Sequence, residues 1–316
     1  MTPGPEGPAA TVVVPTRGGR HRMATLLTLL EAQDLPDLEV VVVVDGDVDG
    51  TTEYLASRAS TVPVRVVTFE SNRGRSAALN AGIAAATGRV VIRCDDDLEP
   101  GPSFVRHHVE AHQGRDVGAI GLYRNVFPDT GYAIAYGRPA DESFRREAYA
   151  VDATGVWRYW AGNVSVTREV AARVGPYDEA FRAYGWEDVD WGYRLHGLGV
   201  PVVLVPGLET THRLSAVTAR SRIERAYFSG AARRQFVAKH DAGWLAPRPP
   251  RSPWRVAVRL VSAVLGEASA RRAGDVADHV AARFPTSWTR HLVGLLVEAA
   301  SDAGYRRGRV SDPSAV

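Results

Sequence analysis

The sequence predicts an α/β fold built around a mostly parallel β-sheet. Short apolar runs rich in valine alternate with segments of helical periodicity, about every 25 residues. This alternation is typical of βαβ units, in which a helix connects two parallel strands. Several of the runs end in acidic residues, and parallel sheets bind ligands at the carboxyl ends of their strands. The predicted strands are 11–15, 39–44, 62–69 and 89–94, and the acidic residues are Asp45, Asp95, Asp96 and Asp97.

The remaining elements follow from the same patterns. Helical segments such as MATLLTLLEAQ and TTEYLASRAS connect the four strands. The pattern weakens from 101 to 160, where we expect irregular loops and short strands. YWAGNVSVTREVAARVG then predicts a turn, a strand and a helix. YDEAFRAYGWEDVDWGYRLHGLG predicts a helix that ends at a glycine pair, and VPVVLVP a further strand.

The chain beyond His212 has helical periodicity and no predicted strand. Four prolines interrupt it between positions 247 and 253, because proline breaks a helix, and leave helical parts at about 215–242 and 254–304. We therefore expect a disordered N-terminus, an α/β domain and a helical C-terminal region. Their predicted ranges are 1–10, 11–213 and 214–316.

The composition is that of an ordinary globular protein, with 316 residues, 45% of them hydrophobic and 23% charged. The single cysteine, Cys94, excludes an internal disulfide framework and fits a reducing compartment. The first ten residues lack the basic and apolar regions of a signal peptide. No run approaches the roughly 18 consecutive apolar residues that a membrane-spanning helix needs. The expected location is the cytoplasm.

The net charge of +2 conceals an asymmetry between the two parts of the chain. Residues 1–212 carry 20 basic and 28 acidic side chains, a net charge of −8, whereas 213–316 carry 18 basic and 8 acidic, a net charge of +10. An acidic body with a basic tail indicates regions with different partners. A solvated, arginine-rich helical surface explains the tail equally well.

Asp95, Asp96 and Asp97 form a D-x-D arrangement directly after a buried strand. Residues i and i+2 of an extended segment point the same way, so Asp95 and Asp97 can present oxygens to one site. Mg²⁺ and Mn²⁺ prefer such oxygens, and substrate phosphates often complete their shell. Acidic clusters that cap a helix or lie in water are the structural alternative.

A second acidic cluster, Glu187, Asp188 and Asp190, opens a predicted helix between Trp186 and Trp191. Carboxylates at a helix N-terminus are stabilised by the helix dipole, so part of the cluster can be capping. Asp188 is the better candidate for a general base, because the two tryptophans flanking it can form a wall for a sugar ring.

Two further features are candidate site residues. Gly162 and Asn163, after Trp160, can shape a pocket, with aromatic core packing as the alternative. His212 follows a strand at a turn, where it is either a structural residue or a metal ligand.

In their order along the chain, TVVVPTR, VVVDGDVDGT, NRGRSAALNAG, CDDD, GNVSVTR, GPYDEAF and WEDVDWGYRLHGLG resemble the motifs of the inverting family 2 glycosyltransferases, which have the GT-A fold. The resemblance runs from about 11 to 213. It implies that the turn formed by Pro15, Thr16 and Arg17 contacts the nucleoside. It also implies that Asp45 binds the base, although Val44 stands where the family often has a first aspartate.

The resemblance extends to the chemistry of the site. It implies that Arg73 and Gly74 lie along the nucleotide and that Asp95 to Asp97 form the donor-binding D-x-D segment. Asp97 is then the direct metal ligand, Asp95 lies nearer the ribose and Asp96 belongs to the nucleotide site. The remaining roles are Asp188 as catalytic base, His212 as a further metal ligand, and Trp160, Gly162, Asn163, Trp186, Glu187 and Trp191 around the donor sugar and acceptor.

The function expected from these motifs is a Mn²⁺- or Mg²⁺-dependent inverting glycosyltransferase with a nucleotide-sugar donor, preferably a UDP-sugar. The acceptor is a saccharide, a lipid-linked molecule, a peptide or a small natural product, and no nucleic acid is expected. A sugar nucleotidyltransferase is one alternative, since PTRGGRHR resembles its basic loop, but that chemistry gives the WED cluster no role. A non-catalytic nucleotide-binding scaffold is another, although every acid that the mechanism needs is present.

The tail contains one pattern of its own. WRVAVRLVSAVLGEASARR places aliphatic residues on one helical face with arginines beside it. Such a helix can lie peripherally on the inner, anionic face of a membrane, hold a lipid-linked acceptor, pack on its own domain or form a homodimer. The aliphatic residues are Ala257, Leu260, Val261, Val264 and Leu265.

Overall fold

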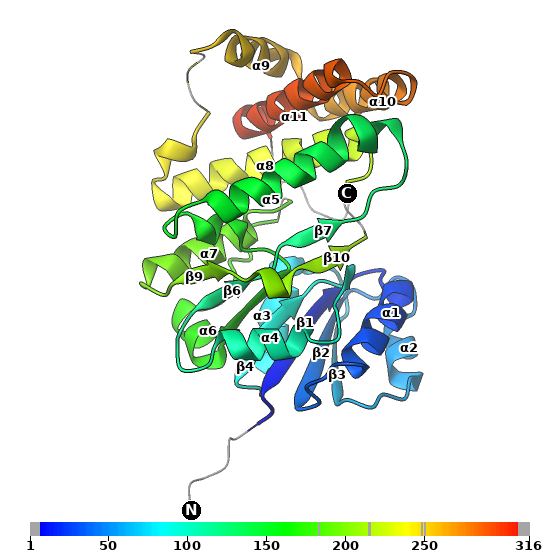
Figure 1. Ribbon diagram of the computed structural model, residues 1–316, viewed down its shortest axis with the longest axis vertical. Coiled ribbons are helices and arrows are strands. Elements are labelled where there is room, and N and C mark those ends of the chain that lie inside the picture. The colour runs from blue at the N-terminus through cyan, green and yellow to red at the C-terminus, as the bar shows by residue number, and fades with distance from the viewer. Residues whose placement is uncertain (1–6, 183, 214–215, 248, 250, 309–316) are drawn as a thin grey trace, which may run out of the picture. The chain divides into compact units, whose positions relative to one another are not determined.

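The computed structural model describes residues 7–182, 184–213, 216–247, 249 and 251–308. The chain forms two compact units (Figure 1). The first consists of Met1–Arg124, Ala148–Glu179 and Glu187–Arg213, and the second of Asn125–Glu147, Ala180–Trp186 and Leu214–Val316. The first unit ends at the predicted boundary, residue 213, but two segments that we placed within the α/β domain group with the C-terminal helices.

The first unit contains a seven-stranded sheet in the order β3-β2-β1-β4-β8-β6-β9 (Figure 1). The strands β1, β2, β3 and β4 are parallel, β6 and β9 are parallel to each other, and β8 runs antiparallel to its neighbours β4 and β6. The mostly parallel sheet is therefore confirmed. The strands are β1 (Ala10–Thr16), β2 (Leu38–Asp45), β3 (Val64–Phe69), β4 (Val90–Cys94), β6 (Gly118–Ile120), β8 (Asn163–Thr167) and β9 (Val202–Leu204).

The central strands form because β-branched residues favour extended backbone and both faces of the sheet are covered. Every residue of β2 is buried, including its run of five valines. Val12 and Val14 of β1 pack with α1, α2 and α4 on one face, whereas Val41 and Val43 of β2 pack with α3 on the other. The helices are α1 (Arg20–Glu31), α2 (Thr51–Ser57), α3 (Arg75–Ala85), α4 (Phe104–Ala111), α6 (Arg168–Val174) and α7 (Glu187–Gly197).

A second, three-stranded sheet has the strand order β5-β10-β7. Its strand β5 directly follows the D-x-D segment in the sequence. Its strands are β5 (Leu98–Glu99), β7 (Tyr123–Asn125) and β10 (Thr210–His212). The antiparallel pairing of β5 with β10 places His212 opposite Leu98. Two residues that are 114 positions apart in the sequence are thereby brought together. This part of the chain also contains two short helical turns, η2 (Val156–Tyr159) and η3 (Pro206–Leu208).

The second unit is helical, as predicted for the tail. Helix α8 (Ala219–His240) packs against α10 (Glu267–Arg283) and α11 (Ser287–Arg307), and α9 (Pro253–Val264) packs against α11. Their shared core includes Ile223, Val258 and Val293. The unit also contains η1 (Ala133–Gly137), η4 (Gly243–Leu245) and most of α5 (Arg138–Ala150).

The structure corrects three expectations about elements. The stretch 101–160 contains the helices α4 and α5 as well as loops and short strands. The tail's second helical part is three helices, because α9 ends at Val264 and α10 at Arg283. Strand β1 begins at Ala10, within the segment expected to be disordered, whose first six residues lie outside the described ones. Across the described residues, no helix has the length and apolarity that crossing a bilayer requires.

Candidate active site

The carboxyl ends of β1, β2 and β4 lie at one edge of the large sheet and carry the predicted nucleotide-binding residues. Asp45 ends β2, and its carboxylate accepts hydrogen bonds from the backbone N–H groups of Arg73, at 2.6 Å, and Gly74, at 2.9 Å. The guanidinium of Arg73 lies 4.5 Å from the ring centroid of Phe69. Asp45 therefore joins the end of β2 to the loop before α3, and the predicted nucleotide residues of these two loops do lie together.

Asp96 connects the D-x-D segment to the turn after β1. The Thr16 hydroxyl donates to Asp96 Oδ2 at 2.5 Å, and Arg22 Nη2 donates to the same oxygen at 2.8 Å. Burial raises the pKa of this carboxyl, although Arg22 and Thr16 oppose the shift. Pro15 and Arg17 flank Thr16 in the sequence, and the Arg17 carbonyl accepts a hydrogen bond from Arg22.

Asp95 is held by β4 and by the start of β8. Arg93 Nε donates to Asp95 Oδ1 at 2.9 Å, and the Asp95 N–H donates to the Gly162 carbonyl at 3.0 Å. A Cβ on Gly162 would lie 2.1 Å from Asp95 Oδ2, so glycine is required at this position. Burial opposes ionisation of Asp95, but the charges of Arg93 and Arg75 hold its pKa below the ordinary value.

Asp97 pairs with His212. His212 Nε2 lies 3.1 Å from Asp97 Oδ2, and the His212 ring packs against Tyr123, with 4.8 Å between the ring centroids. A carboxylate oxygen and an imidazole nitrogen side by side fit Mn²⁺ or Mg²⁺, provided that donor phosphates supply further oxygens.

The metal-binding roles of Asp95, Asp97 and His212 stay a prediction. Asp95 is turned to Arg93, and the described residues contain no group of three or more His, Cys, Asp or Glu placed to hold a metal ion. Asp95 and Asp97 thus have different partners, because Asp95 leaves β4 beside a guanidinium whereas Asp97 leads into the pairing of β5 with β10.

Asp188 lies in the first turn of α7, as predicted, and forms an ion pair with Arg93 Nη1. Its side chain is 13% exposed, and that of Arg93 is 4% exposed. Arg93 thereby contacts both Asp95 and Asp188. Burial disfavours the charged form of Arg93, yet the two carboxylates raise its pKa well above the ordinary value. One buried guanidinium joins the predicted base to the predicted donor-binding segment.

Glu187 lies beside Asp188 and is buried. Its Oε1 lies 3.3 Å from Arg75 Nη1, while Oε2 is buried without a hydrogen-bond partner among the described residues. Burial and the neighbouring charge of Asp188 raise the pKa of Glu187 to about 7. Glu187 can therefore change its protonation state near neutral pH.

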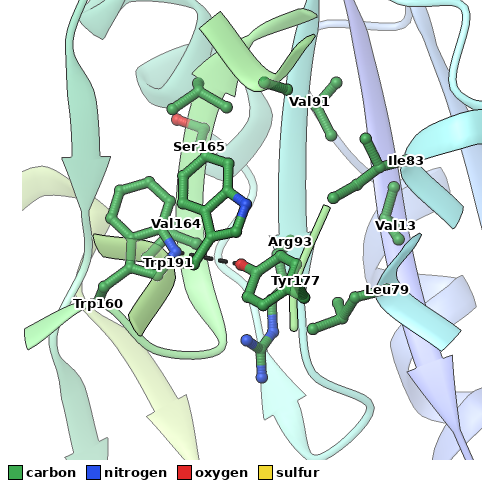
Figure 2. Close-up of a pocket in the computed structure, with 12 residues that line it drawn as sticks. Val13, Leu79, Ile83, Val91, Arg93, Trp160, Val164, Ser165, Tyr177 and Trp191 are labelled. Carbon is green, nitrogen blue, oxygen red and sulfur yellow. Dashed lines mark hydrogen bonds between the residues drawn. The ribbon is translucent and has the colours of Figure 1, made fainter. Parts of the chain in front are cut away.

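The structure corrects the predicted sugar contacts of Trp160 and Trp191. Both are buried, and their rings stack with 5.0 Å between centroids (Figure 2). Trp160 Nε1 donates to the Tyr177 hydroxyl, and Tyr177 stacks on Trp191. These rings line a small, mainly apolar cavity in the first unit, together with Leu79 and Ile83. They are core residues, as the structural alternative proposed.

Asn163 is also buried, and it points into a polar network instead of a pocket. Its Oδ1 lies 3.0 Å from His108 Nε2, and its amide donates to the Leu208 carbonyl at 2.7 Å. Ser165 Oγ lies 2.8 Å from His108 Nδ1 and 2.7 Å from His112 Nε2. Burial lowers the pKa of His108 to about 3 and that of His112 to about 4, so both rings are neutral at pH 7.

Trp186 belongs to the second unit, where its Nε1 donates to Ser229 Oγ at 3.0 Å and its ring packs against Phe236. Its φ of 68° is unusual for a residue other than glycine and places backbone strain directly before α7. Strain of this kind clusters at functional sites. The predicted role of Trp186 at the sugar stays a prediction.

Sequence reasoning missed Arg93, Arg75 and Tyr123. Arg93 had a recognisable signal, because a charged residue inside the apolar run RVVIRC must find a partner once the strand is buried. Tyr123 accepts a hydrogen bond from the Gly162 N–H at 2.6 Å and supports the ring of His212. It lies in a stretch whose elements the sequence did not predict, so it gave no comparable signal.

A mostly parallel sheet with acidic residues at its strand ends, joined to an acidic helix start, defines the GT-A class of folds. Residues 11–175 match the family described as Glycosyl transferase family 2. This match covers more than half of the 316 residues, and the chain belongs to glycosyl transferase family 2.

Among curated proteins, validoxylamine A glucosyltransferase of Streptomyces hygroscopicus subsp. jinggangensis (strain 5008) is 29% identical over 239 residues, which cover 65% of this chain and 56% of the relative. The chain thus spans little more than half of that relative.

Two solved structures share the fold. One is the mannosyltransferase PcManGT from Pyrobaculum calidifontis in complex with GDP-Man and Mn²⁺, with a TM-score of 0.63, 19% identity, and coverage of 95% of this chain and 89% of that chain. The other is S. aureus TarS 1-349 in complex with UDP, with a TM-score of 0.51, 15% identity, and coverage of 95% and 92%.

Proposed function

We propose that the protein is a metal-dependent inverting glycosyltransferase that moves a sugar from a nucleotide-sugar donor to a hydroxyl acceptor. The observation that carries the proposal is the arrangement around Arg93, which holds Asp188 and Asp95 at the carboxyl end of β4. Membership of glycosyl transferase family 2 supports the reaction class and speaks against a sugar nucleotidyltransferase. Asp188, Asp95 and Asp97 are all present, which speaks against a non-catalytic scaffold.

Asp188 acts as the general base in this mechanism. Its carboxylate takes the proton of the acceptor hydroxyl while the hydroxyl oxygen bonds to the anomeric carbon. The bond between that carbon and the donor's phosphate oxygen breaks on the opposite face, and the nucleoside diphosphate leaves. A single displacement of this kind inverts the configuration at the anomeric carbon. Arg93 keeps the Asp188 carboxylate oriented before the acceptor arrives.

The donor occupies the loops at the strand ends. Asp45, with the Arg73–Gly74 backbone, is proposed to lie at the base, Thr16 and Asp96 along the nucleoside, and Asp95 near the ribose. Asp97 and His212 are the residues that would hold Mn²⁺ or Mg²⁺. When bound, the metal would neutralise the departing diphosphate as a Lewis acid.

A UDP-sugar is the preferred donor, with a GDP-sugar as the second choice. Two proteins of the same fold bind these bases, TarS with UDP and PcManGT with GDP-Man and Mn²⁺. The glucosyltransferase relative supports a hexose as the transferred sugar. A saccharide, a lipid-linked molecule, a peptide and a small natural product all remain candidate acceptors.

The experiment that tests the function starts with thermal shifts for UDP-, GDP- and dTDP-sugars, each with and without Mn²⁺. We expect one base to stabilise the protein in a metal-dependent manner, and Asp97→Ala to abolish the metal dependence. Transfer or donor hydrolysis is then measured for the wild type and Asp188→Asn. Asp188→Asn should bind the donor normally and lose about 100-fold or more in kcat, because a positioned base contributes that much. Asp188→Asn turnover at the wild-type rate would refute the mechanism.

The second unit is proposed to serve the acceptor or a surface. On α9, Val256, Leu260 and Val264 are exposed, while Val258 and Leu265 are buried. The predicted aliphatic face is thus divided, with part of it packing inside the unit. The exposed part, in a region of net charge +10, suits an anionic membrane surface at the cytoplasmic side, and a homodimer contact is the alternative.

A further inference from the structure

The guanidinium of Arg93 lies between two carboxylates that come from distant parts of the chain. Its Nε is 2.9 Å from Asp95 Oδ1, two residues away, and its Nη1 pairs with Asp188, 95 residues away. The Arg93 side chain is 4% exposed. A fork of donors fixed in one plane can hold two carboxylates at set directions, which a single ammonium group cannot do.

The surroundings leave the Arg93 side chain little freedom. Its guanidinium carbon lies 6.0 Å from the ring centroid of Tyr177, whose hydroxyl accepts a hydrogen bond from Trp160 (Figure 2). Trp191 stacks on Tyr177, with 5.4 Å between the ring centroids. Tyr177, which packs with the buried Trp160 and Trp191, therefore lies beside the guanidinium.

Burying an arginine at this position costs desolvation free energy, so we expect it to have a function that an aliphatic residue could not perform. It lies in an otherwise apolar strand in which Val90, Val91 and Ile92 are buried. Moving a cation into such a setting carries a desolvation penalty that aliphatic packing would avoid. The two acids that compensate its charge are the proposed base and a proposed donor-binding residue.

We propose that Arg93 is a positioning residue, which sets the direction of the Asp188 carboxylate and ties it to the donor-binding segment at Asp95. This inference deepens the proposed function and rests on it. Arg93 does not contact the reacting atoms and acts through Asp188. Its removal should therefore lower turnover by misplacing the base, and should matter little once the base itself is gone.

A double-mutant cycle on kcat tests this dependence. The four proteins are the wild type, Arg93→Met, Asp188→Asn and the double variant, assayed with saturating donor and Mn²⁺. We expect Arg93→Met to lower kcat about 100-fold, since a misplacement of about 1 Å has that effect. In the Asp188→Asn background the same change should cost less than about 3-fold, because residues that act as a unit are not additive.

Arg22→Met is the matched control, because Arg22 pairs with Asp96 in the same D-x-D segment and has no contact with Asp188 among those described. The factor by which Arg22→Met lowers kcat should be the same in the wild type and in the Asp188→Asn background. If Arg93→Met also multiplies with Asp188→Asn, or if it keeps wild-type kcat, the inference is wrong. If Asp188→Asn itself turns over normally, the proposed function fails instead, so the two failures are distinguishable.

A crystal structure of Arg93→Met gives a readout independent of turnover. We expect the Asp188 carboxylate to leave its position beside β4, and an unmoved carboxylate would overturn the inference. Should Arg93→Met fail to fold, Arg93→Lys enters the same cycle and the same crystallography. Lysine keeps the charge, but it cannot hold both acids, so kcat should still fall about 10-fold or more and the effect should still vanish in Asp188→Asn.

Discussion

At the scale of single residues, the site is a set of acids that differ in their partners. Asp45 accepts backbone N–H groups, Asp96 pairs with Arg22, and Asp97 pairs with His212. Asp188 shares Arg93 with Asp95. The partner of each acid decides the direction in which its carboxylate points, and therefore which part of the reaction it can serve.

Glu187 provides a prediction about pH. Its pKa is about 7 in the folded protein against an ordinary 4.5, so between these values the folded state binds a proton that the unfolded state lacks. The stability it contributes is fully present below pH 4.5 and is lost as the pH rises through 7.

Glu187→Gln removes this dependence on pH. From pH 4.5 to 7, the free energy of unfolding of Glu187→Gln should therefore rise relative to that of the wild type, by about 2 to 3 kcal/mol. Urea unfolding at pH 5 and pH 8 measures the difference. The same difference in free energy of unfolding between the two proteins at both pH values would contradict the raised pKa of Glu187.

At the scale of elements, the positions of the site residues depend on strand ends and on the helices packed behind them. The network of His108, His112, Ser165 and Asn163 joins α4 to β8, immediately beside Gly162. Because the Gly162 carbonyl accepts a hydrogen bond from the Asp95 N–H, this network supports the D-x-D segment through Gly162. In the second unit, α8 and α11 pack closely against each other.

The contact of α8 with α11 yields a prediction on helix packing. A Cβ on Gly304 would lie 1.8 Å from the Tyr227 carbonyl oxygen, so Gly304→Ala should destabilise the protein by about 1 to 3 kcal/mol. Gly294 in the same helix is the control, since its Cβ would meet Tyr136 at an ordinary 3.8 Å.

Gly294→Ala should be neutral or stabilise by up to about 1 kcal/mol, because alanine favours a helix. Thermal unfolding of both variants measures these effects. The same loss of stability in the two variants would show that helix propensity, and not the approach of α8 to α11, sets the requirement for glycine.

At the scale of the whole molecule, the chain combines two units of opposite net charge. The first is acidic and contains the candidate active site, and the second is basic and helical. The charge division of the sequence approximates the division into units, although residues 125–147 and 180–186 also belong to the second. Different partners for the two units are the simplest consequence. We propose the nucleotide-sugar donor as the partner of the first unit and an anionic surface as the partner of the second.

Vesicle binding tests the second unit. We expect the protein to sediment with anionic vesicles and to lose binding about 10-fold or more in Leu260→Glu/Val264→Glu, since the substitutions remove apolar contact and add repulsion. Leu198→Glu, at an exposed position after α7, is the matched control and should keep wild-type binding. A homodimer that the double variant dissociates, without any vesicle binding, would favour the alternative.

Much of the fold could be predicted because its signals are local. The valine runs, the helical periods and the acids at strand ends each depend on a few neighbouring residues, so β1 to β4 and the placement of Asp45 and Asp95 followed from the sequence. The helices in the stretch 101–160 were missed although both are amphipathic, because α4 has only eight residues and α5, RPADESFRREAYA, is mostly polar and charged.

The sequence by itself determined the alternation of strands and helices and the acidic loops at the carboxyl ends, since chain period and turn chemistry act locally. Tertiary structure alone decided that Trp160, Trp191 and Asn163 are buried. It also decided which carboxylate pairs with which basic side chain, including the contact of Arg93 with Asp188. Those two residues are 95 positions apart. Their contact exists because the order of strands in the sheet carries β4 to the start of α7, and no local pattern encodes that order.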